Sequence, residues 1–315
     1  MRSFELTAPR TLELREIPVP EPGPNEVLVR VVVCAVCNGT DLATFRGEFS
    51  GGFGHELAGV VEEVGPAVSY VAPGDRVLCI GKSQPRSGYS EWVVVPEGNV
   101  VRAPRELDFE AIALGELLSV VAKCVARQQP WGEPTVIFGL GPAGIMVTQL
   151  VRTMAAPLIT TDPIAERCEL SLKFGADASM PPQALADYLK QAGLYRRVAM
   201  AYEAAGSMDA FRAAIDILRE DGNLGVIGAQ FKPVEVDLLQ WERASVNLVM
   251  TATWPSAELR RKFGGMALRL LEHDRVDWRR MITHRFRLED LPQAIALIEE
   301  HPERVCKAVI HIGQG

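Results

Sequence analysis

The sequence predicts an α/β protein in which a barrel-like region of short strands is followed by a doubly wound parallel sheet. Three observations support this fold class. The first third of the chain consists of short β-branched runs separated by Gly, Pro and Asp, and from about residue 110 strands alternate with helical segments. A G-x-G-x-x-G pattern at 139–144 then lies between a strand-like run and a helical one, as in a dinucleotide-binding unit.

The N-terminal third is expected to form a small β domain. Its β-branched runs are short and closely spaced, which is typical of a barrel-like all-β arrangement. Two Pro-rich stretches, at 18–25 and 96–104, are expected to be loops. The predicted strands of this domain are residues 25–36, 54–65, 74–81 and 88–96.

The middle of the chain has the pattern of consecutive βαβ units. A helical segment at 108–129 comes first, and the strands that follow alternate with helices, which indicates a parallel sheet. The predicted order is strand, glycine turn and helix at 134–154, strand 156–162, helix 163–177, strand 196–206, helix 207–221, strand 222–229 and strand 245–253. The last part is predicted as helix 256–278, strand 281–288, helix 289–303 and strand 306–312, and this final strand would return the tail to the β domain.

Composition and charge exclude several classes of protein. The 315 residues carry a formal net charge of −7, so neither a nucleic-acid surface nor an anionic-membrane surface is expected. The first residues are charged throughout and lack the apolar segment of a signal peptide, and no apolar run is long enough to span a bilayer. Six cysteines are too few for a disulfide scaffold in a chain of this length. A cytoplasmic protein with reduced thiols is therefore expected.

The glycine motif has the residue types that a dinucleotide pyrophosphate requires. Gly139 permits a tight turn, Gly141 lets the backbone approach the pyrophosphate, and Gly144 allows close packing of helix on strand. The predicted cofactor-binding loop consists of Gly139, Leu140, Gly141, Pro142, Ala143 and Gly144.

A carboxylate for the adenosine ribose should follow about 20 residues after the first glycine. Asp162 lies 162 − 139 = 23 residues on, at the end of the second strand. Its charge would repel a 2′-phosphate, so NAD(H) is favoured over NADP(H). Arg167 is either a flank of the ribose or a solvated helix residue. Gly228, at the end of a later strand, is a further cofactor-binding candidate.

The stretch "VVVCAVCNGTDLATF" raises the question of what its two cysteines do. A structural zinc knuckle would need a second pair of ligands, and a redox pair should begin a helix, whereas Cys34 ends a β run and is expected to be a buried thiol. Cys37 differs because His55 and Glu56 follow in "FGHELAG". Cys37, His55 and a carboxylate such as Glu56 would supply the three ligands of a catalytic zinc, and Glu116 is a further candidate.

These motifs, in this order, resemble the zinc-containing medium-chain alcohol and polyol dehydrogenases over nearly the whole chain. The similar segments include "LELREIPVPEPGPNEVLVRV", "GHELAGVVEEVG", "VAPGDRV", "GLGPAGIMVTQL" and "ITHRFRLEDLPQAI". The resemblance implies a GroES-like catalytic domain interrupted by a Rossmann-type domain, with boundaries at 1–118, 119–254 and 255–315. It also implies one catalytic zinc on Cys37, His55 and Glu56, with Glu116 ranked last as a ligand.

The resemblance implies a reaction as well as a fold. Zinc would lower the pKa of an alcohol, Thr40 would relay its proton, and hydride would pass to the nicotinamide. The chain departs from the family at Thr40, which follows Cys37 by three residues instead of two, at Ala43, where a His is usual, and in lacking the four-cysteine lobe of a structural zinc. Asp41 is expected to be a structural residue that supports the metal ligands and not an acid–base catalyst. Tyr89, Trp241 and Trp254 are expected to line a cleft, to form a subunit contact or to pack in the core or on the surface.

The expected function is oxidation of a secondary alcohol, of the polyol, sugar or cyclitol kind, by a homodimer or homotetramer. Two alternatives remain. One is a zinc-free quinone or enone reductase of the same superfamily, and the other is an NAD(H)-binding protein without turnover.

Overall fold

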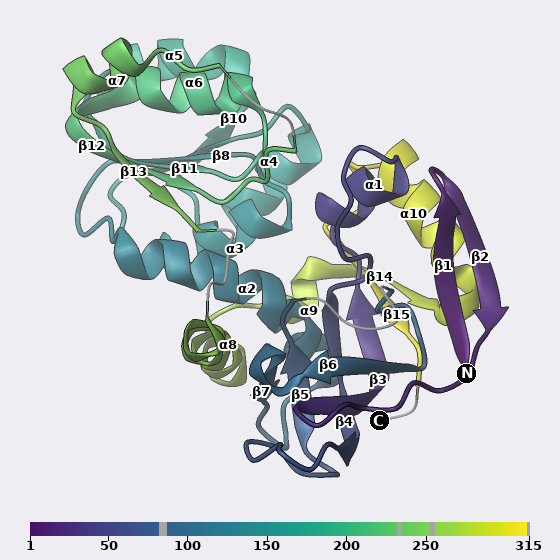
Figure 1. Ribbon diagram of the computed structural model, residues 1–315. Coiled ribbons are helices and arrows are strands. Elements are labelled where there is room, and N and C mark those ends of the chain that lie inside the picture. Colours follow the sequence, from purple (N-terminus) through teal and green to yellow (C-terminus); the bar gives the residue numbers. More distant parts are fainter. Residues whose placement is uncertain (82–86, 232–234, 252–255, 314–315) are drawn as a thin grey trace. The chain divides into compact units, whose positions relative to one another are not determined.

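The structure is a computed structural model that describes residues 1–81, 87–231, 235–251 and 256–313 (Figure 1). The chain divides into two compact units. One comprises Met1–Ser119 with Trp254–Gly315, and the other comprises Val120–Thr253. The predicted boundary between 254 and 255, like Trp254 itself, lies outside the described residues.

The first unit is built on a seven-stranded sheet. Its strands are β3 (Glu26–Ala35), β4 (Glu56–Val64), β5 (Arg76–Cys79), β6 (Trp92–Pro96), β7 (Val100–Arg102), β14 (Ile282–Arg287) and β15 (Lys307–His311). The strand order is β14-β15-β3-β4-β5-β7, with β6 paired to β3. Because β15 pairs antiparallel with β3, opposing Val309 to Ala35, the C-terminal strand belongs to the same sheet as the N-terminal strands.

Strand β3 is the centre of this sheet. It pairs with β4, β6 and β15, and nearly all of its side chains are buried, which explains its long run of Val and Ala. A separate hairpin, β1 (Arg2–Ala8) with β2 (Thr11–Glu16), precedes it. The helices of this unit are α1 (Thr40–Phe45), α8 (Ala257–Glu272), α9 (Trp278–Met281) and α10 (Leu291–Glu300), and α2 (Phe109–Arg127) begins here and runs into the second unit.

The second unit is a parallel sheet with helices on both faces. Its strands are β8 (Thr135–Phe138), β9 (Leu158–Thr161), β10 (Ala178–Met180), β11 (Val198–Glu203), β12 (Leu218–Val226) and β13 (Asn247–Met250). Every neighbouring pair is parallel, and the order β10-β9-β8-β11-β12-β13 is that of a doubly wound dinucleotide-binding sheet. The predicted α/β fold class is therefore confirmed.

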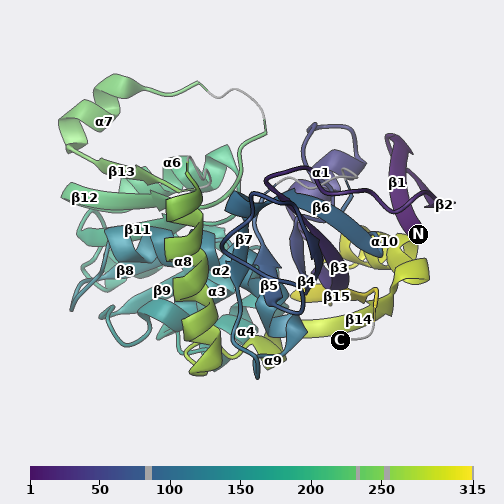
Figure 2. The same ribbon diagram turned by 60° about the horizontal axis from the view of Figure 1, so that its bottom comes forward.

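The helices of the second unit alternate with its strands. They are α3 (Pro142–Val151), α4 (Ala165–Lys173), α5 (Pro182–Gln191), α6 (Met208–Ile217) and α7 (Leu238–Ala244). Helices α3 and α6 lie on opposite faces of the sheet (Figures 1 and 2). Chain order reverses between β8 and β11, so their carboxyl ends form the switch point at which such sheets bind ligands.

Two features of this unit differ from the pattern expected from the sequence. Strand β10 and helix α5 are additional elements between the second and third predicted strands. The helix expected over 207–221 ends at Ile217, because Leu218 is extended and pairs with Val198 of β11. Sheet pairing here overrides the helical propensity of the following residues. Among the described residues no helix is long and apolar enough to cross a membrane.

Candidate metal centre and cofactor loop

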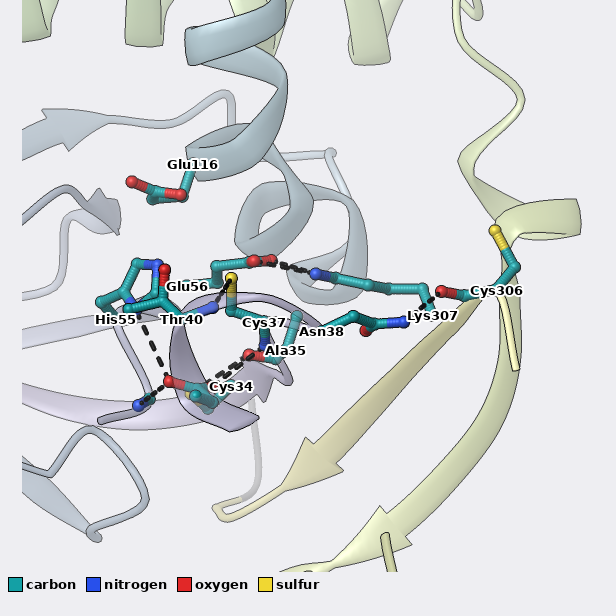
Figure 3. A network of polar contacts seen from close by, with 12 residues as sticks. Cys34, Ala35, Cys37, Asn38, Thr40, His55, Glu56, Glu116, Cys306 and Lys307 are labelled. Atoms are coloured by element: carbon teal, nitrogen blue, oxygen red, sulfur yellow. Dashed lines mark hydrogen bonds and ion pairs between the residues drawn. The ribbon is translucent and has the colours of Figure 1, made fainter. Parts of the chain in front are cut away.

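Three side chains with metal-ligand chemistry converge in the first unit. Cys37 follows β3, His55 precedes β4, and Glu56 is the first residue of β4, so the ends of two paired strands bring them together (Figure 3). One ligand atom of each lies within 4.8 Å of the others. Glu56 is fully buried, whereas Cys37 and His55 are partly exposed, so the group can be reached from solvent.

The Asp41 carboxylate forms hydrogen bonds with both segments that carry the candidate ligands. Its Oδ2 accepts hydrogen bonds from the backbone N–H of Cys37 (3.0 Å) and the Tyr89 hydroxyl (2.6 Å). Its Oδ1 accepts from the backbone N–H of Gly54 (2.9 Å) and lies 3.6 Å from Nδ1 of His55. Nε2 is then the ring nitrogen of His55 left for a metal ion. Burial would raise the pKa of Asp41, but its bonds with His55, Tyr89 and Cys37 hold that pKa below its usual value.

The site carries a surplus of negative groups. Desolvation lowers the pKa of His55, yet hydrogen bonds to Asp41 and Cys37 and the nearby Glu116 raise it well above its ordinary value. Burial raises the pKa of Glu116 to about 7, with a further contribution from the charge of Glu56. Three buried acidic groups, Asp41, Glu56 and Glu116, thus lie at the site, and the ammonium of Lys307 is 2.6 Å from Glu56.

Glu116 stands apart from the other three candidates. It lies on α2, and it is not part of the group of ligand atoms within 4.8 Å. In the view of Figure 3, His55 and Thr40 lie between Glu116 and Cys34. Thr40 begins α1, and its backbone N–H donates to Cys37 Sγ over 3.4 Å. Its hydroxyl points toward the same side of the site as the Glu116 carboxylate (Figure 3).

The donors fit a zinc ion. A thiolate, an imidazole and a carboxylate are the ligand types of zinc, and three protein ligands leave a position for substrate. Glu56 also lies beside a buried cation, because the ammonium of Lys307 donates a 2.8 Å hydrogen bond to its Oε1 and lies 2.6 Å from its Oε2.

The glycine loop lies where β8 passes into α3. Gly139 has a φ of +86°, which other residues avoid, and a Cβ there would meet the backbone of Ala205 at 2.6 Å. A Cβ on Gly144 would overlap the carbonyl oxygen of Gly139. A Cβ on Gly141 would meet nothing within 4 Å. Two glycines therefore serve packing, and the third leaves open space beside the start of α3. In the same loop the Leu140 side chain is buried, and Pro142 is the first residue of the helix.

Asp162 is placed directly beside this loop. Its Oδ2 accepts a 2.7 Å hydrogen bond from Leu140 N–H, and its Oδ1 accepts one of 2.9 Å from Ile164 N–H. Arg167 lies 3.8 Å from the same carboxylate, so it pairs with Asp162. Gly228 has a packing reason for its identity, since a Cβ would collide with Gly206 and approach Glu203 Oε2 at 2.6 Å.

Comparison with known families shows which family the chain belongs to. The profile of the alcohol dehydrogenase GroES-like domain matches residues 23–105, and that of the zinc-binding dehydrogenases matches residues 142–264. The chain belongs to the zinc-type medium-chain alcohol and polyol dehydrogenases. The first unit of this dehydrogenase is accordingly GroES-like and the second is Rossmann-like, as the sequence predicted.

Individual members of the family align with this dehydrogenase over most of its length. Sorbitol dehydrogenase of Homo sapiens is 29% identical, with 93% of this chain and 91% of that protein covered. An L-threonine 3-dehydrogenase of Rhizobium etli is 27% identical, with 89% of each covered. The same fold occurs in the alcohol dehydrogenase TADH from Thermus sp. ATN1, which superposes with a TM-score of 0.87 at 20% identity, covering 99% of this chain and 100% of that one.

Two residues that support the site were not identified from the sequence. Tyr89 was left open between a cleft, a subunit contact and packing, and it proves to be a fully buried donor to Asp41. Lys307, the partner of Glu56, lies 251 residues from it in the chain. No spacing pattern signals such a pair, because only the pairing of β15 with β3 brings the two together.

Proposed function

We propose that this protein is a zinc- and NAD(H)-dependent dehydrogenase that interconverts a secondary alcohol and its ketone, with a polyol, sugar or cyclitol-like substrate. The observation that carries the proposal is the coexistence of two sites in one chain. The Cys37, His55 and Glu56 group lies in the first unit, and the Gly139–Gly144 loop with Asp162 lies in the second. Family membership and the dehydrogenase relatives support oxidoreduction of CH–OH groups.

The metal and the cofactor supply the reactive chemistry when bound, a Lewis acid that acidifies an alcohol and a nicotinamide that accepts hydride. This chain's residues hold and orient them. Cys37, His55 and Glu56 are the proposed zinc ligands, and Asp41 fixes the ring of His55. Thr40 is the proposed relay that takes the hydroxyl proton toward solvent, and the 3.4 Å contact of its backbone N–H with Cys37 Sγ, which places it at the metal group, supports this role. Glu116, with a pKa of about 7, is proposed to remain outside the ligand set.

We propose one zinc ion per chain. Within the part of the chain that the structure describes, Cys37, His55 and Glu56 are the one group of three His, Cys, Asp or Glu side chains with ligand atoms this close together. Cys79, the cysteine that follows "GDRV", is buried, and burial raises the pKa of its thiol to about 12, which disfavours the thiolate that zinc needs.

NAD(H) is the proposed cofactor. The Asp162 carboxylate lies beside the loop, and an adenosine 2′-phosphate would bring a second negative charge toward it. Arg167 already pairs with that carboxylate. A protein of the same fold from Sinorhizobium meliloti 1021, with a TM-score of 0.82 at 23% identity, was solved with NADP bound, so both nucleotides belong in the test.

We also propose that the protein forms a homodimer or a larger homo-oligomer, located in the cytoplasm. Strand β13 ends the six-stranded sheet, and Leu248 and Met250 on it are 40% and 59% exposed. The neighbouring α7 exposes Leu238 and Leu239. An edge strand with exposed apolar side chains is a template for pairing with a second chain.

The test is an activity screen combined with metal analysis. Purified protein should contain one equivalent of zinc and reduce NAD with at least one member of a panel of polyols, cyclitols and amino alcohols, followed by NADH absorbance. Cys37→Ser should abolish both zinc retention and turnover, while the matched Cys124→Ser, at a buried thiol of the second unit, should preserve both. Full activity without zinc would point to a quinone or enone reductase. Cofactor binding without any turnover would point to a non-catalytic protein.

A further inference from the structure

Glu203 is a buried carboxylate at the carboxyl end of β11, and none of its side chain is exposed. Its Oε1 accepts hydrogen bonds from the backbone N–H groups of Ala205, over 2.8 Å, and Gly206, over 2.7 Å. Its buried Oε2 has no hydrogen-bond partner among the described residues. Burial raises the pKa of Glu203, and the backbone N–H groups of Gly206, Ala205 and Ser207 oppose that rise because they favour the ionised form.

The turn that follows β11 does not itself require a charged side chain. A side-chain amide oxygen would accept the same two hydrogen bonds from Ala205 and Gly206 without carrying a charge. Burying an ionised carboxylate costs free energy unless a cation pairs with it. In the described part of the chain no Lys, Arg or His side chain forms an ion pair with Glu203. The structure thus places a negative charge here whose partner is not among the described side chains.

Glu203 lies where the strand order of the six-stranded sheet reverses. Along the sheet it is paired with Phe138, the last residue of β8, and with Val226, the last residue of β12. Its backbone carbonyl accepts a 3.0 Å hydrogen bond from Gly228 N–H, and a Cβ on Gly228 would lie 2.6 Å from Oε2. Because Gly228 is partly exposed and has no side chain, the carboxylate lies directly beneath the surface at these strand ends.

The proposed cofactor would bring a cation to these strand ends. Asp162 follows β9, on one side of β8, and faces the adenosine ribose in the proposed site, whereas β11 and β12 lie on the other side of β8. A dinucleotide crosses such a switch point with its pyrophosphate at the glycine loop, so its nicotinamide half extends toward the ends of β11 and β12. The nicotinamide ring is a pyridinium cation in NAD⁺ and is uncharged in NADH. A carboxylate beneath these ends therefore attracts the oxidised form alone.

We propose that the buried carboxylate of Glu203 acts on the nicotinamide end of the cofactor site and strengthens the binding of NAD⁺ relative to NADH. This inference rests on the proposed NAD(H) site. Glu203 acts through its charge, across Gly228, and takes no part in proton or hydride transfer. In the direction of alcohol oxidation NADH is the product, so a preference for NAD⁺ favours release of the product.

The test compares cofactor affinities, which can be measured without turnover. Glu203→Gln removes the charge and keeps a carbonyl oxygen for the turn at 204–207. Calorimetric titration of the purified zinc-containing protein should give a Kd for NAD⁺ about ten-fold higher than that of wild type, with the Kd values of NADH and ADP-ribose changed less than about two-fold. ADP-ribose has the adenosine, the pyrophosphate and the second ribose of the cofactor but no nicotinamide. The matched control Glu133→Gln removes an exposed carboxylate of the same unit and should alter none of the three.

Two results would overturn this role of Glu203. Unchanged affinities in Glu203→Gln, or equal losses for NAD⁺, NADH and ADP-ribose, would mean that Glu203 only shapes the turn. If that variant does not fold, wild type is titrated with NAD⁺ and with an analogue in which uncharged benzamide replaces nicotinamide. The analogue should bind roughly ten-fold more weakly, and equal or tighter binding would reject the attraction. Failure of wild type to bind NAD⁺, NADH and ADP-ribose would instead reject the proposed function.

Discussion

The Tyr89 hydroxyl donates a 2.6 Å hydrogen bond to Oδ2 of Asp41, and both side chains are fully buried. The same carboxylate binds the backbone N–H groups of Cys37 and Gly54, which belong to the two loops that carry the metal ligands. Tyr89 is held in turn by an edge-on contact with Phe53, at 4.9 Å between ring centres. Asp41 therefore connects these two loops, and the hydrogen bond from Tyr89 fixes the orientation of the Asp41 carboxylate.

Removal of this hydroxyl should loosen the metal site. In Tyr89→Phe the ring still packs, but Asp41 loses a donor and can rotate away from Cys37 and His55. We expect zinc affinity to fall about 10–100-fold, the range found for partners that orient metal ligands, with a loss of unfolding free energy of about 1–2 kcal/mol. Competition with a chelator measures the first effect and urea unfolding the second.

A matched tyrosine separates these two effects. Tyr202 is equally buried, and its hydroxyl donates a 2.5 Å hydrogen bond to the carbonyl oxygen of Gln128 in the second unit. Tyr202→Phe should cost a similar free energy of unfolding and leave zinc affinity unchanged. Equal zinc affinities in the two variants would remove Tyr89 from the supporting structure of the site.

The two glycines Gly141 and Gly144 should respond differently to the same substitution. A Cβ on Gly141 meets nothing within 4 Å, and its φ of −64° suits alanine, so Gly141→Ala should fold with wild-type stability. The added methyl group would occupy the space proposed for the pyrophosphate, and the Kd for NADH should rise about ten-fold or more. Titration by NADH fluorescence measures this Kd.

Gly144→Ala is the counterpart that tests packing. Its Cβ overlaps the Gly139 carbonyl, and we expect a loss of about 2–4 kcal/mol in unfolding free energy. Thermal unfolding of the two variants should therefore separate them, with only Gly144→Ala shifted. Unchanged NADH binding by a stable Gly141→Ala variant would contradict the proposed place of the pyrophosphate.

Much of the fold could be predicted from the sequence because short local patterns indicate its elements. The glycines of the 139–144 turn, with the strand before and the helix after, indicate a dinucleotide-binding unit without tertiary information, and Asp162 follows at the expected distance. The elements that were not predicted depend on partners distant in sequence. Leu218 leaves the helix because Val198 pairs with it, and β10 is a three-residue edge strand too short to produce a period.

In the candidate site, too, some residues could be predicted from local patterns and others could not. The residue types and spacing of Cys37, His55 and Glu56 indicate metal chemistry, and adjacent strand ends then bring them together. Lys307 carries no local signal, since a lysine near the C-terminus has the appearance of a surface residue until β15 is paired with β3. The roles of Thr40 and Glu116 remain predictions for the proposed reaction.

Glu110 should make stability depend on pH in the acid range. Its carboxylate forms two 2.8 Å hydrogen bonds with Arg285 of β14 and one with Nε2 of His311. Burial would raise the pKa of Glu110, but these partners lower it below the ordinary value of 4.5. A lowered folded-state pKa means that the stabilisation is present above the unfolded pKa and is lost as pH falls through the folded one.

Glu110→Gln should accordingly lose on the order of 1–2 kcal/mol of unfolding free energy at neutral pH. The difference from wild type should shrink as the solution is acidified below about pH 4. Urea unfolding over a pH series measures it. Glu133 makes a similar two-bond contact with Arg219, but both are exposed, so Glu133→Gln should cost less than about 1 kcal/mol at any pH. A pH-independent cost for Glu110→Gln would contradict the assignment.

The open edge of the six-stranded sheet should control assembly. On β13, Leu248 and Met250 are exposed, and charged side chains on an edge strand prevent pairing between chains. The variant Leu248→Lys/Met250→Lys should therefore sediment as a monomer, whereas wild type sediments as a dimer or tetramer. Leu172→Lys is the control, because Leu172 is similarly exposed at 45% but lies on α4, away from the edge. Retention of the oligomer by the double lysine variant would place the subunit contact elsewhere on the chain.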